Sequence, residues 1–166
     1  NDSGGEPELY QFDMTTGRVI RTVRMKGVRN QDWEALAHDS THFYIGNFGN
    51  NFGNRKDLVI YKARIDDLLR LDELPVAAIR FTYPDQDRYY NGYNHNHDAE
   101  AIIVYQDKIH LFSKNWQDRR CKLYTLPTDP GTYTATFVSE FDEDFFSSLD
   151  AYVGRMSRMA RGVIRS

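Results

Sequence analysis

One short acidic motif occurs twice in this chain, and it constrains the fold more than any other feature. Residues 32–36 read Asp-Trp-Glu-Ala-Leu and residues 98–102 read Asp-Ala-Glu-Ala-Ile, which puts the two copies 66 residues apart. Twelve residues after each aspartate comes a second apolar run, at 44–45 in one copy and 110–111 in the other. Self-similarity at a fixed spacing is the signature of a repeat architecture. The sequence therefore predicts at least two copies of one structural unit.

Each copy is predicted to contain four strands. Short apolar runs between turn residues lie at 33–38, 42–48, 57–64 and 76–83 in the first copy, and at 99–105, 108–114, 121–126 and 132–140 in the second. Four short antiparallel strands joined by turns describe one blade of a β-propeller. An aromatic content of 14% agrees, because aromatic side chains fit the half-buried surface of strands. The predicted fold class is all-β, with antiparallel four-stranded blades of an incomplete β-propeller.

The 166 residues are predicted to form a single domain of this kind. Its parts are the end of a blade at 1–28, a blade at 29–84, a second blade at 95–141 and a tail at 142–166. Within the first part, residues 8–13 and 19–24 read as an outer hairpin. Residues 65–71 fit a short helical turn and an irregular loop equally well. Apolar residues at three- and four-residue steps in the tail favour a C-terminal amphipathic helix, whereas the propeller pattern would put the next blade's inner strand there.

Composition and charge exclude several functional classes. A formal net charge of −3 and a pI near 5.9 provide no basic face for a nucleic-acid backbone, so nucleic acid is not an expected partner. No run of residues approaches the roughly 18 to 20 apolar residues that span a bilayer, so no membrane span is expected. Cys121 is the only cysteine, which rules out an internal disulfide, and its apolar neighbours predict a buried, inert thiol.

Four segments carry a resemblance to a known family. They are residues 1–5, which read Asn-Asp-Ser-Gly-Gly, and residues 30–34, 44–51 and 97–101. Over roughly residues 1–140 the chain resembles a family of secreted bacterial β-propellers of largely unknown function, distantly similar to the phytase-like and NHL-repeat propellers. In those proteins an Asp-x-Glu-Gly or Asp-x-Glu-Ala motif often opens the innermost strand of a blade. The resemblance implies a secreted or periplasmic protein.

The extent of the chain departs from that family. A closed propeller has typically four to eight blades, whereas this chain holds two and a fraction. It is therefore expected to be a fragment, a truncated product or one part of an assembly. An open fragment leaves sheet edges and apolar faces uncovered, which favours self-association.

The repeated carboxylates are the first candidate site. Innermost strands line the channel of a propeller, so one mouth is predicted to gather Asp32, Glu34, Asp98 and Glu100, joined by Asp2 if its segment lies nearby. Oxygen ligands of this kind suit Ca²⁺ or Mg²⁺, and Ca²⁺ is the expected cofactor. The alternative is structural, with each carboxylate accepting hydrogen bonds from backbone N–H groups of the neighbouring blade. Strand alternation predicts that Asp32 and Glu34 share one face.

Ligand contacts are predicted at two further places. One is the N-terminal segment, with Asn1 and Asp2. The other is the glycine- and asparagine-rich loop 46–55, with Asn50 and Arg55. Tight turns explain this loop first, although it could also present backbone N–H groups and Arg55 to an anion. The corresponding loop at 114–120 again ends in arginine, which suggests a blade-stabilising ion pair in both copies, or a binding rim.

Two histidines, His95 and His97, have the His-x-His spacing of some metal sites. No third ligand follows from the spacing, so a polar loop is favoured over a transition-metal site. The sequence contains no nucleophile elbow and no zinc-helix motif. The leading hypothesis is a non-catalytic module that binds a small-molecule ligand or protein partner at the channel mouth, with Ca²⁺ at the acidic motifs. The competing hypothesis, a metal-dependent hydrolase of phytase-like or lactonase-like type, follows from the resemblance alone.

Overall fold

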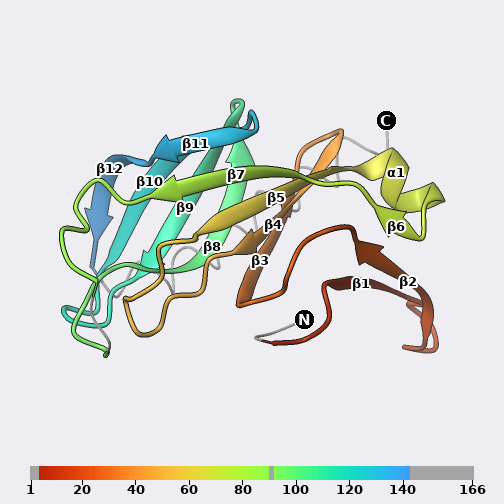
Figure 1. Cartoon of the computed structure of the whole chain (residues 1–166), viewed down its shortest axis with the longest axis horizontal. Helices are drawn as coiled ribbons and strands as arrows, with labels where there is room; N and C mark the ends of the chain where they lie inside the picture. The colour runs from red at the N-terminus through yellow and green to blue at the C-terminus, as the bar shows by residue number, and fades with distance from the viewer. Residues whose placement is uncertain (1–3, 90–91, 143–166) are drawn as a thin grey trace.

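The fold was analysed in a computed structural model, which describes residues 4–89 and 92–142. These residues form twelve strands and one short helix, arranged in three sheets (Figure 1). The predicted all-β class is confirmed. The predicted hairpin near the N-terminus is confirmed as well, and residues 65–71, for which helix and loop were equally expected, contain the helix α1 (Ile65–Arg70). The predictions for the tail fall outside the described residues.

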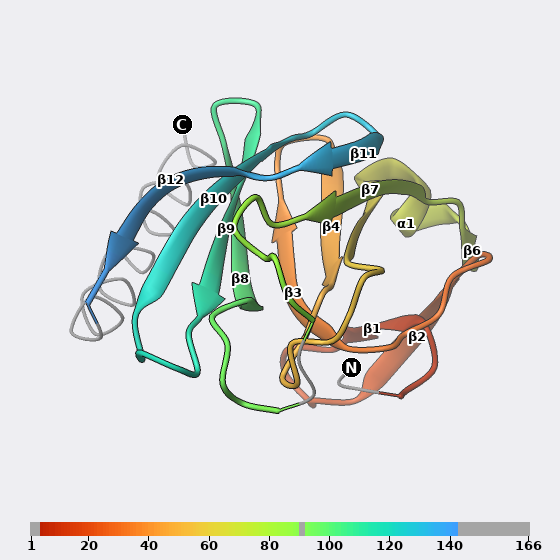
Figure 2. The same ribbon diagram turned by 60° about the vertical axis from the view of Figure 1, so that its left-hand side comes forward.

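The three sheets follow one another along the chain. The first sheet has the order β1 (Glu8–Phe12), β2 (Val19–Met25), β6 (Glu73–Leu74). The second sheet has the order β11 (Gly131–Thr134), β7 (Ala77–Thr82), β5 (Val59–Arg64), β4 (His42–Asn47), β3 (Trp33–His38). The third sheet has the order β12 (Thr136–Phe141), β10 (Cys121–Pro127), β9 (Lys108–Lys114), β8 (Asp98–Tyr105). Strands β3 and β8, which open the second and third sheets, lie next to each other (Figure 2).

The predicted strand at 132–140 is wrong in one respect, because it is two strands in different sheets. β11 pairs in parallel with β7, and β12 pairs antiparallel with β10. The chain changes sheets at the buried Ala135, whose N–H donates to the carbonyl of Thr82 at 2.9 Å. Seven other predicted strands correspond to one observed strand each, with ends that differ by at most two residues.

Short parallel strands join successive sheets. β6 pairs in parallel with β2, and then the chain continues into β7, the last of the four antiparallel strands of the next sheet. β11 pairs in parallel with β7 in the same way, and the chain then continues into β12. In both cases a short strand just before the chain enters the next sheet pairs in parallel with a strand of the preceding sheet, which connects one sheet to the next.

Two apolar clusters fill the space between the sheets. The cluster between the second and third sheets includes the fully buried Tyr44, Phe48, Leu111 and Tyr124. The cluster between the first and second sheets includes Val23, Met25, Trp33, Ile45 and Leu74. The prediction of a buried thiol is confirmed, because Cys121 is fully buried and free, and burial raises the pKa of its thiol to about 12. In the described part of the chain, no helix is long and apolar enough to cross a membrane.

Candidate functional site

The two acidic motifs have the same backbone geometry. One lies at the start of β3 and the other at the start of β8, and each pairs with the following strand through a register shift. In the second sheet Trp33 is opposite Asn47 and Ala35 is opposite Gly46; in the third sheet Ala99 is opposite Ser113 and Ala101 is opposite Phe112. The extra residue is therefore Glu34 in one motif and Glu100 in the other. A β-bulge of this kind bends the strand and redirects the side chain that it carries.

Asp32 and Glu34 converge on Gly49. A Cβ atom added to Gly49 would overlap the carboxylate of Asp32 and lie against Oε1 of Glu34, so a larger residue here would displace the ends of both side chains. The Gly49 N–H also donates to the carbonyl of Asp32 at 3.2 Å. The two side chains share one face, as predicted, while Trp33 between them packs into the apolar cluster between the first and second sheets. The loop after β4 therefore holds two carboxylates of the first motif side by side.

The ammonium of Lys114 lies among the carboxylates of both motifs. Its Nζ is 2.9 Å from Oε1 of Glu100 and 4.5 Å from the ring centroid of Trp116. The hydrogen bond with Glu100 is the main reason that the pKa of Lys114 is raised, and the negative charges of Asp98 and Glu34 add to it. Lys114 is the last residue of β9 and is opposite Asp98 in β8, so the sheet itself brings this cation to the second acidic motif.

Asp98 makes a contact between the second and third sheets. It is fully buried; one carboxylate oxygen accepts a hydrogen bond from the backbone N–H of Asn50 at 2.7 Å, and the other accepts one from the indole N–H of Trp116 at 2.8 Å. Burial raises the pKa of Asp98, and these two hydrogen bonds oppose the rise. Because Asn50 belongs to the loop after β4, Asp98 has the geometry that the structural alternative requires.

The predicted ligand residues Asn50 and Arg55 are engaged within their own loop and its neighbour. The Asn50 side chain donates to the carbonyl of His97 at 2.9 Å and accepts from the Arg55 N–H at 2.9 Å. The guanidinium of Arg55 donates to the carbonyls of Gly49 and Asn47 and pairs with Asp57 at 3.0 Å. Its side chain is only 9% exposed. These contacts support the turn role, whereas Asn1 and Asp2 fall outside the described residues.

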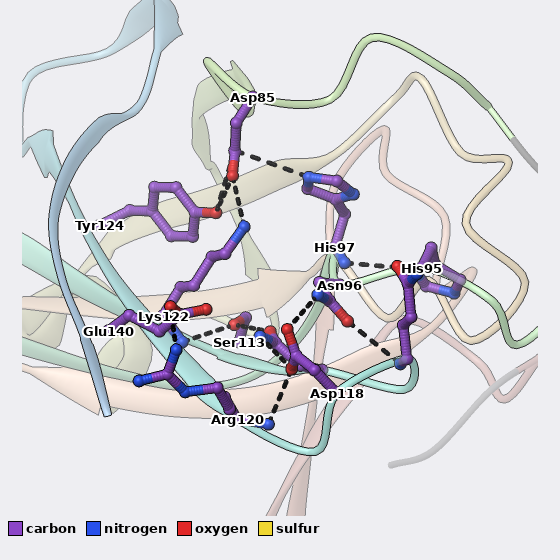
Figure 3. Close-up of polar contacts among 12 residues, drawn as sticks. Asp85, His95, Asn96, His97, Ser113, Asp118, Arg120, Lys122, Tyr124 and Glu140 are labelled. Carbon is purple, nitrogen blue, oxygen red and sulfur yellow. Dashed lines mark hydrogen bonds and ion pairs between the residues drawn. The ribbon is translucent and has the colours of Figure 1, made fainter. Parts of the chain in front are cut away.

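The arginines that end the two loops both form ion pairs, as one alternative predicted. Arg55 pairs with Asp57, and Arg120 pairs with Glu140 at 2.7 Å and Asp142 at 3.0 Å. The pair with Glu140 connects the segment before β10 to β12 (Figure 3). The Arg55 pair lies in the loop between β4 and β5 of the second sheet. The two Arg120 pairs lie at β10 and β12 of the third sheet, so each arginine forms ion pairs within its own sheet.

The two histidines belong to a polar loop. His95 Nε2 lies 2.9 Å from the carbonyl of Asn51, and its Nδ1 accepts from the His97 N–H at 3.1 Å. The His97 ring packs on Tyr83 and its Nε2 is 3.6 Å from a carboxylate oxygen of Asp85. Within residues 4–89 and 92–142, no three His, Cys, Asp or Glu side chains stand together as a metal site.

Sequence reasoning missed a polar cluster centred on Asp85 (Figure 3). The carboxylate accepts from Lys122 Nζ at 2.6 Å and from the hydroxyl of Tyr124 at 3.0 Å, and His97 lies beside it. Asp85 follows β7, whereas Lys122 and Tyr124 belong to β10, so the cluster joins the second sheet to the third. The sequence did show that Lys122 and Tyr124, two residues apart in a predicted strand, would share one face. Nothing in it connected them to Asp85, 37 residues before Lys122.

We expect Asp85 to make stability depend on pH below about pH 4. Burial alone would raise the pKa of Asp85, but the nearby His97 ring and the hydrogen bonds from Lys122 and Tyr124 lower it below its ordinary value. A carboxyl group of this kind stabilises the fold above its unfolded pKa, and the contribution is lost as the pH falls through the folded pKa.

Urea unfolding from about pH 5 to about pH 2 checks this expectation. The stability of Asp85→Asn should fall less over this range than that of the wild type. Lys122→Met removes one of the donors and should reduce the pH dependence in the same direction, by a smaller amount. Equal pH dependence in all three proteins would contradict the assignment.

An aromatic cluster borders the acidic motifs. The Tyr93 ring lies 4.8 Å from the Trp116 ring and 5.3 Å from the Phe52 ring, measured between centroids. Phe52 and Tyr93 are about half exposed, at 48% and 54%. Since Trp116 contacts both Asp98 and Lys114, the aromatic cluster and the carboxylates form one continuous region, which we call the acidic end. A positive group there would meet carboxylates and ring faces together.

Comparison with known proteins adds no identification. No family model, no curated protein and no solved structure matches the chain. Its function is therefore argued from the geometry above.

Proposed function

We propose that the chain is a non-catalytic binding module made of β-propeller blades, and that its acidic end binds a positively charged group of a small ligand or protein partner. The observation that carries the proposal is the position of Lys114. Its ammonium lies 2.9 Å from Glu100 and 4.5 Å from the centroid of the Trp116 ring, so a cation already occupies part of this region. An incoming ammonium or guanidinium group would meet the same chemistry.

The strand order supports the propeller architecture. The second sheet contains four antiparallel strands in chain order, β3, β4, β5 and β7, and the third contains β8, β9, β10 and β12. The bulges of the two motifs are at equivalent positions, and each later sheet attaches to the earlier one by a parallel strand. By the same correspondence, the β1–β2 hairpin matches the outer half of a blade. The resemblance to secreted bacterial propellers agrees with this proposal and with a secreted or periplasmic location.

Charge and ring geometry favour an organic cation. The carboxylates of Glu100, Asp98 and Glu34 act on the Lys114 ammonium, and Asp32 lies beside Glu34 at Gly49, so the acidic end gathers carboxylates of both motifs. The rings of Phe52, Tyr93 and Trp116 are tilted by 45° and 58° relative to their neighbours, so they do not form a flat platform. Phe52 and Tyr93 are about half exposed, so a cation over one of these ring faces would be attracted by the ring and by the neighbouring carboxylates together.

The fit to Ca²⁺ is poorer. Both carboxylate oxygens of Asp98 accept hydrogen bonds from the protein, and Glu100 pairs with Lys114. Among the described residues, no three acidic or histidine side chains form a metal site. Binding of Ca²⁺ at Asp32 and Glu34 stays a prediction, and the experiment below includes it.

Titration with a lysine methyl ester, followed by NMR, tests the proposal. We expect shifts of the Trp116 indole and Gly49 amide signals, and Glu34→Gln should weaken binding about two- to five-fold, the range for one exposed charge pair. Asp66→Asn removes the same charge from the exposed helix α1 and should bind like the wild type.

A parallel titration with CaCl₂ distinguishes the occupants. A larger response to Ca²⁺ than to the amine, lost in Glu34→Gln, would replace the organic cation by the metal. Equal responses in Glu34→Gln and Asp66→Asn would contradict a site at the acidic end.

A further inference from the structure

A pocket with a basic lining lies beside the junction of β5 and α1. It has a volume of about 440 Å³, within the range of small-molecule sites. Its charged lining residues are His42, Lys62, Arg64 and Asp67. Its apolar walls include Val76, which precedes β7, and Pro130, which precedes β11. The pocket therefore combines a compact apolar surface with two cations, a histidine and one carboxylate.

The register of β4 and β5 gathers the basic side chains. His42 is opposite Arg64, and Tyr44 is opposite Lys62. Opposite residues of an antiparallel pair share a face, and so do residues two apart on one strand. Lys62, Arg64 and His42 therefore lie on one face of the second sheet. Cations brought this close repel each other, and a bound anion would offset that repulsion.

Lys62 is held in place by two contacts and still has donors to offer. Its Nζ donates to the carbonyl of Thr128 at 2.9 Å and lies 5.5 Å from the centroid of the Tyr44 ring. An ammonium group has three N–H donors, and in the described part of the chain Lys62 pairs with no carboxylate. A carboxylate ligand would therefore meet a cation that is already positioned and able to donate to it.

The second cation, Arg64, is only weakly paired. Its Nη2 is 3.5 Å from Oδ2 of Asp66, and the two side chains are 60% and 59% exposed, so water screens the pair. The carboxylate that lines the pocket is that of Asp67. With His42 neutral, the lining carries one positive charge in excess, which a single carboxylate group would balance.

We propose that this pocket binds a small organic carboxylate. The ligand carboxylate lies between the Lys62 ammonium and the Arg64 guanidinium, and its apolar part packs on Val76 and Pro130. The segment that carries Pro130 is tied to the second sheet by the Thr128 carbonyl, which accepts from Lys62, and by the parallel pairing of β11 with β7. The walls are thus in place before a ligand arrives. This site is separate from the acidic end and does not depend on the cationic ligand proposed there.

Titration with sodium benzoate, followed by NMR at constant ionic strength, tests the proposal. We expect the amide signals of Arg64 and Ala77 to shift in a saturable way, and the amide signal of Gly49 at the acidic end to stay in place. Benzamide has nearly the same shape without the charge, so it should bind more weakly than benzoate. Equal binding of the two compounds, or no shift at Arg64 and Ala77, would overturn the proposal.

Variants of the lining should change benzoate binding in opposite directions. Lys62→Met should weaken it about two- to five-fold, as expected for losing one partly exposed charge pair. Asp67→Asn should strengthen it, because a repelling carboxylate is removed from the lining. Lys56→Met removes the same charge as Lys62→Met, from an exposed position in the loop before β5, and should bind like the wild type.

Arg64→Gln provides a second variant if Lys62→Met folds poorly, because the Arg64 side chain is 60% exposed. It should weaken benzoate binding by a similar factor while leaving the thermal unfolding midpoint close to that of the wild type. Equal binding by Arg64→Gln and Lys56→Met would contradict the site. Weaker binding by Asp67→Asn than by the wild type would contradict it as well.

Discussion

Phe48→Ala is expected to lower the free energy of unfolding by about 3–5 kcal/mol, the range for truncating a fully buried phenylalanine. Phe48 is completely buried between the second and third sheets, in the cluster that includes Ile102 and Tyr124. Its ring meets the Phe81 ring edge-on, with centroids 6.2 Å apart. Truncation would leave a cavity at the contact that holds the two sheets together.

Urea unfolding of the wild type and the variant measures this loss. Phe52→Ala is a close control, because Phe52 is four residues away in the same loop and is 48% exposed. It should cost much less, since about half of its surface is exposed to water in the folded state. Equal losses for Phe48→Ala and Phe52→Ala would mean that Phe48 is not part of the core.

A substitution at Gly46 provides a second test of the Phe48 contact. A Cβ atom at Gly46 would overlap the Phe48 ring, so Gly46→Ala is expected to destabilise the wild type. In a Phe48→Ala background the same methyl group enters the cavity left by the ring. The two substitutions should therefore be less damaging together than the sum of their separate effects, because residues in direct contact are not additive.

The strands were largely predictable from the sequence, because short alternating runs between turn residues are a local signal. The division of residues 131–141 between two sheets was not. Residues 131–141 read Gly-Thr-Tyr-Thr-Ala-Thr-Phe-Val-Ser-Glu-Phe, with no proline or internal glycine to mark a break. Whether such a run pairs with β7 or with β10 depends on strands that are distant in sequence, and periodicity carries no information about partners.

The candidate site was predictable only in part, for a similar reason. Both acidic motifs were visible, and Asp32 and Glu34 do share one face. The ammonium of Lys114 among these carboxylates follows from the β8–β9 register, which sequence spacing does not supply. The cluster around Asp85 likewise depends on how two sheets pack. Local patterns indicated which residues were polar, and tertiary contacts decided which of them met.

Asp98→Ala is expected to lower the free energy of unfolding on the order of 2–5 kcal/mol, even in the presence of a chelator. The substitution leaves the Asn50 N–H and the Trp116 indole N–H without their acceptors, 2.7 Å and 2.8 Å from the lost oxygens. Each unsatisfied buried donor costs about 1–3 kcal/mol. Asp98→Asn keeps one carbonyl oxygen for one of these donors, so its loss should be intermediate.

Glu100→Gln is the matched control for Asp98→Ala, because it alters the second carboxylate of the same motif. Glu100 pairs with Lys114 in a partly exposed position, and such pairs contribute about 0–1 kcal/mol. A large loss of stability for Asp98→Ala in EDTA, with a small one for Glu100→Gln, would assign Asp98 to the contact between the second and third sheets. Suppose instead that Asp98→Ala and the wild type had the same free energy of unfolding in EDTA, and that Asp98→Ala was less stable only when Ca²⁺ was added. The carboxylate would then act through a metal. The hydrogen bonds to Asn50 and Trp116 would then be secondary, because their loss alone would have cost nothing measurable.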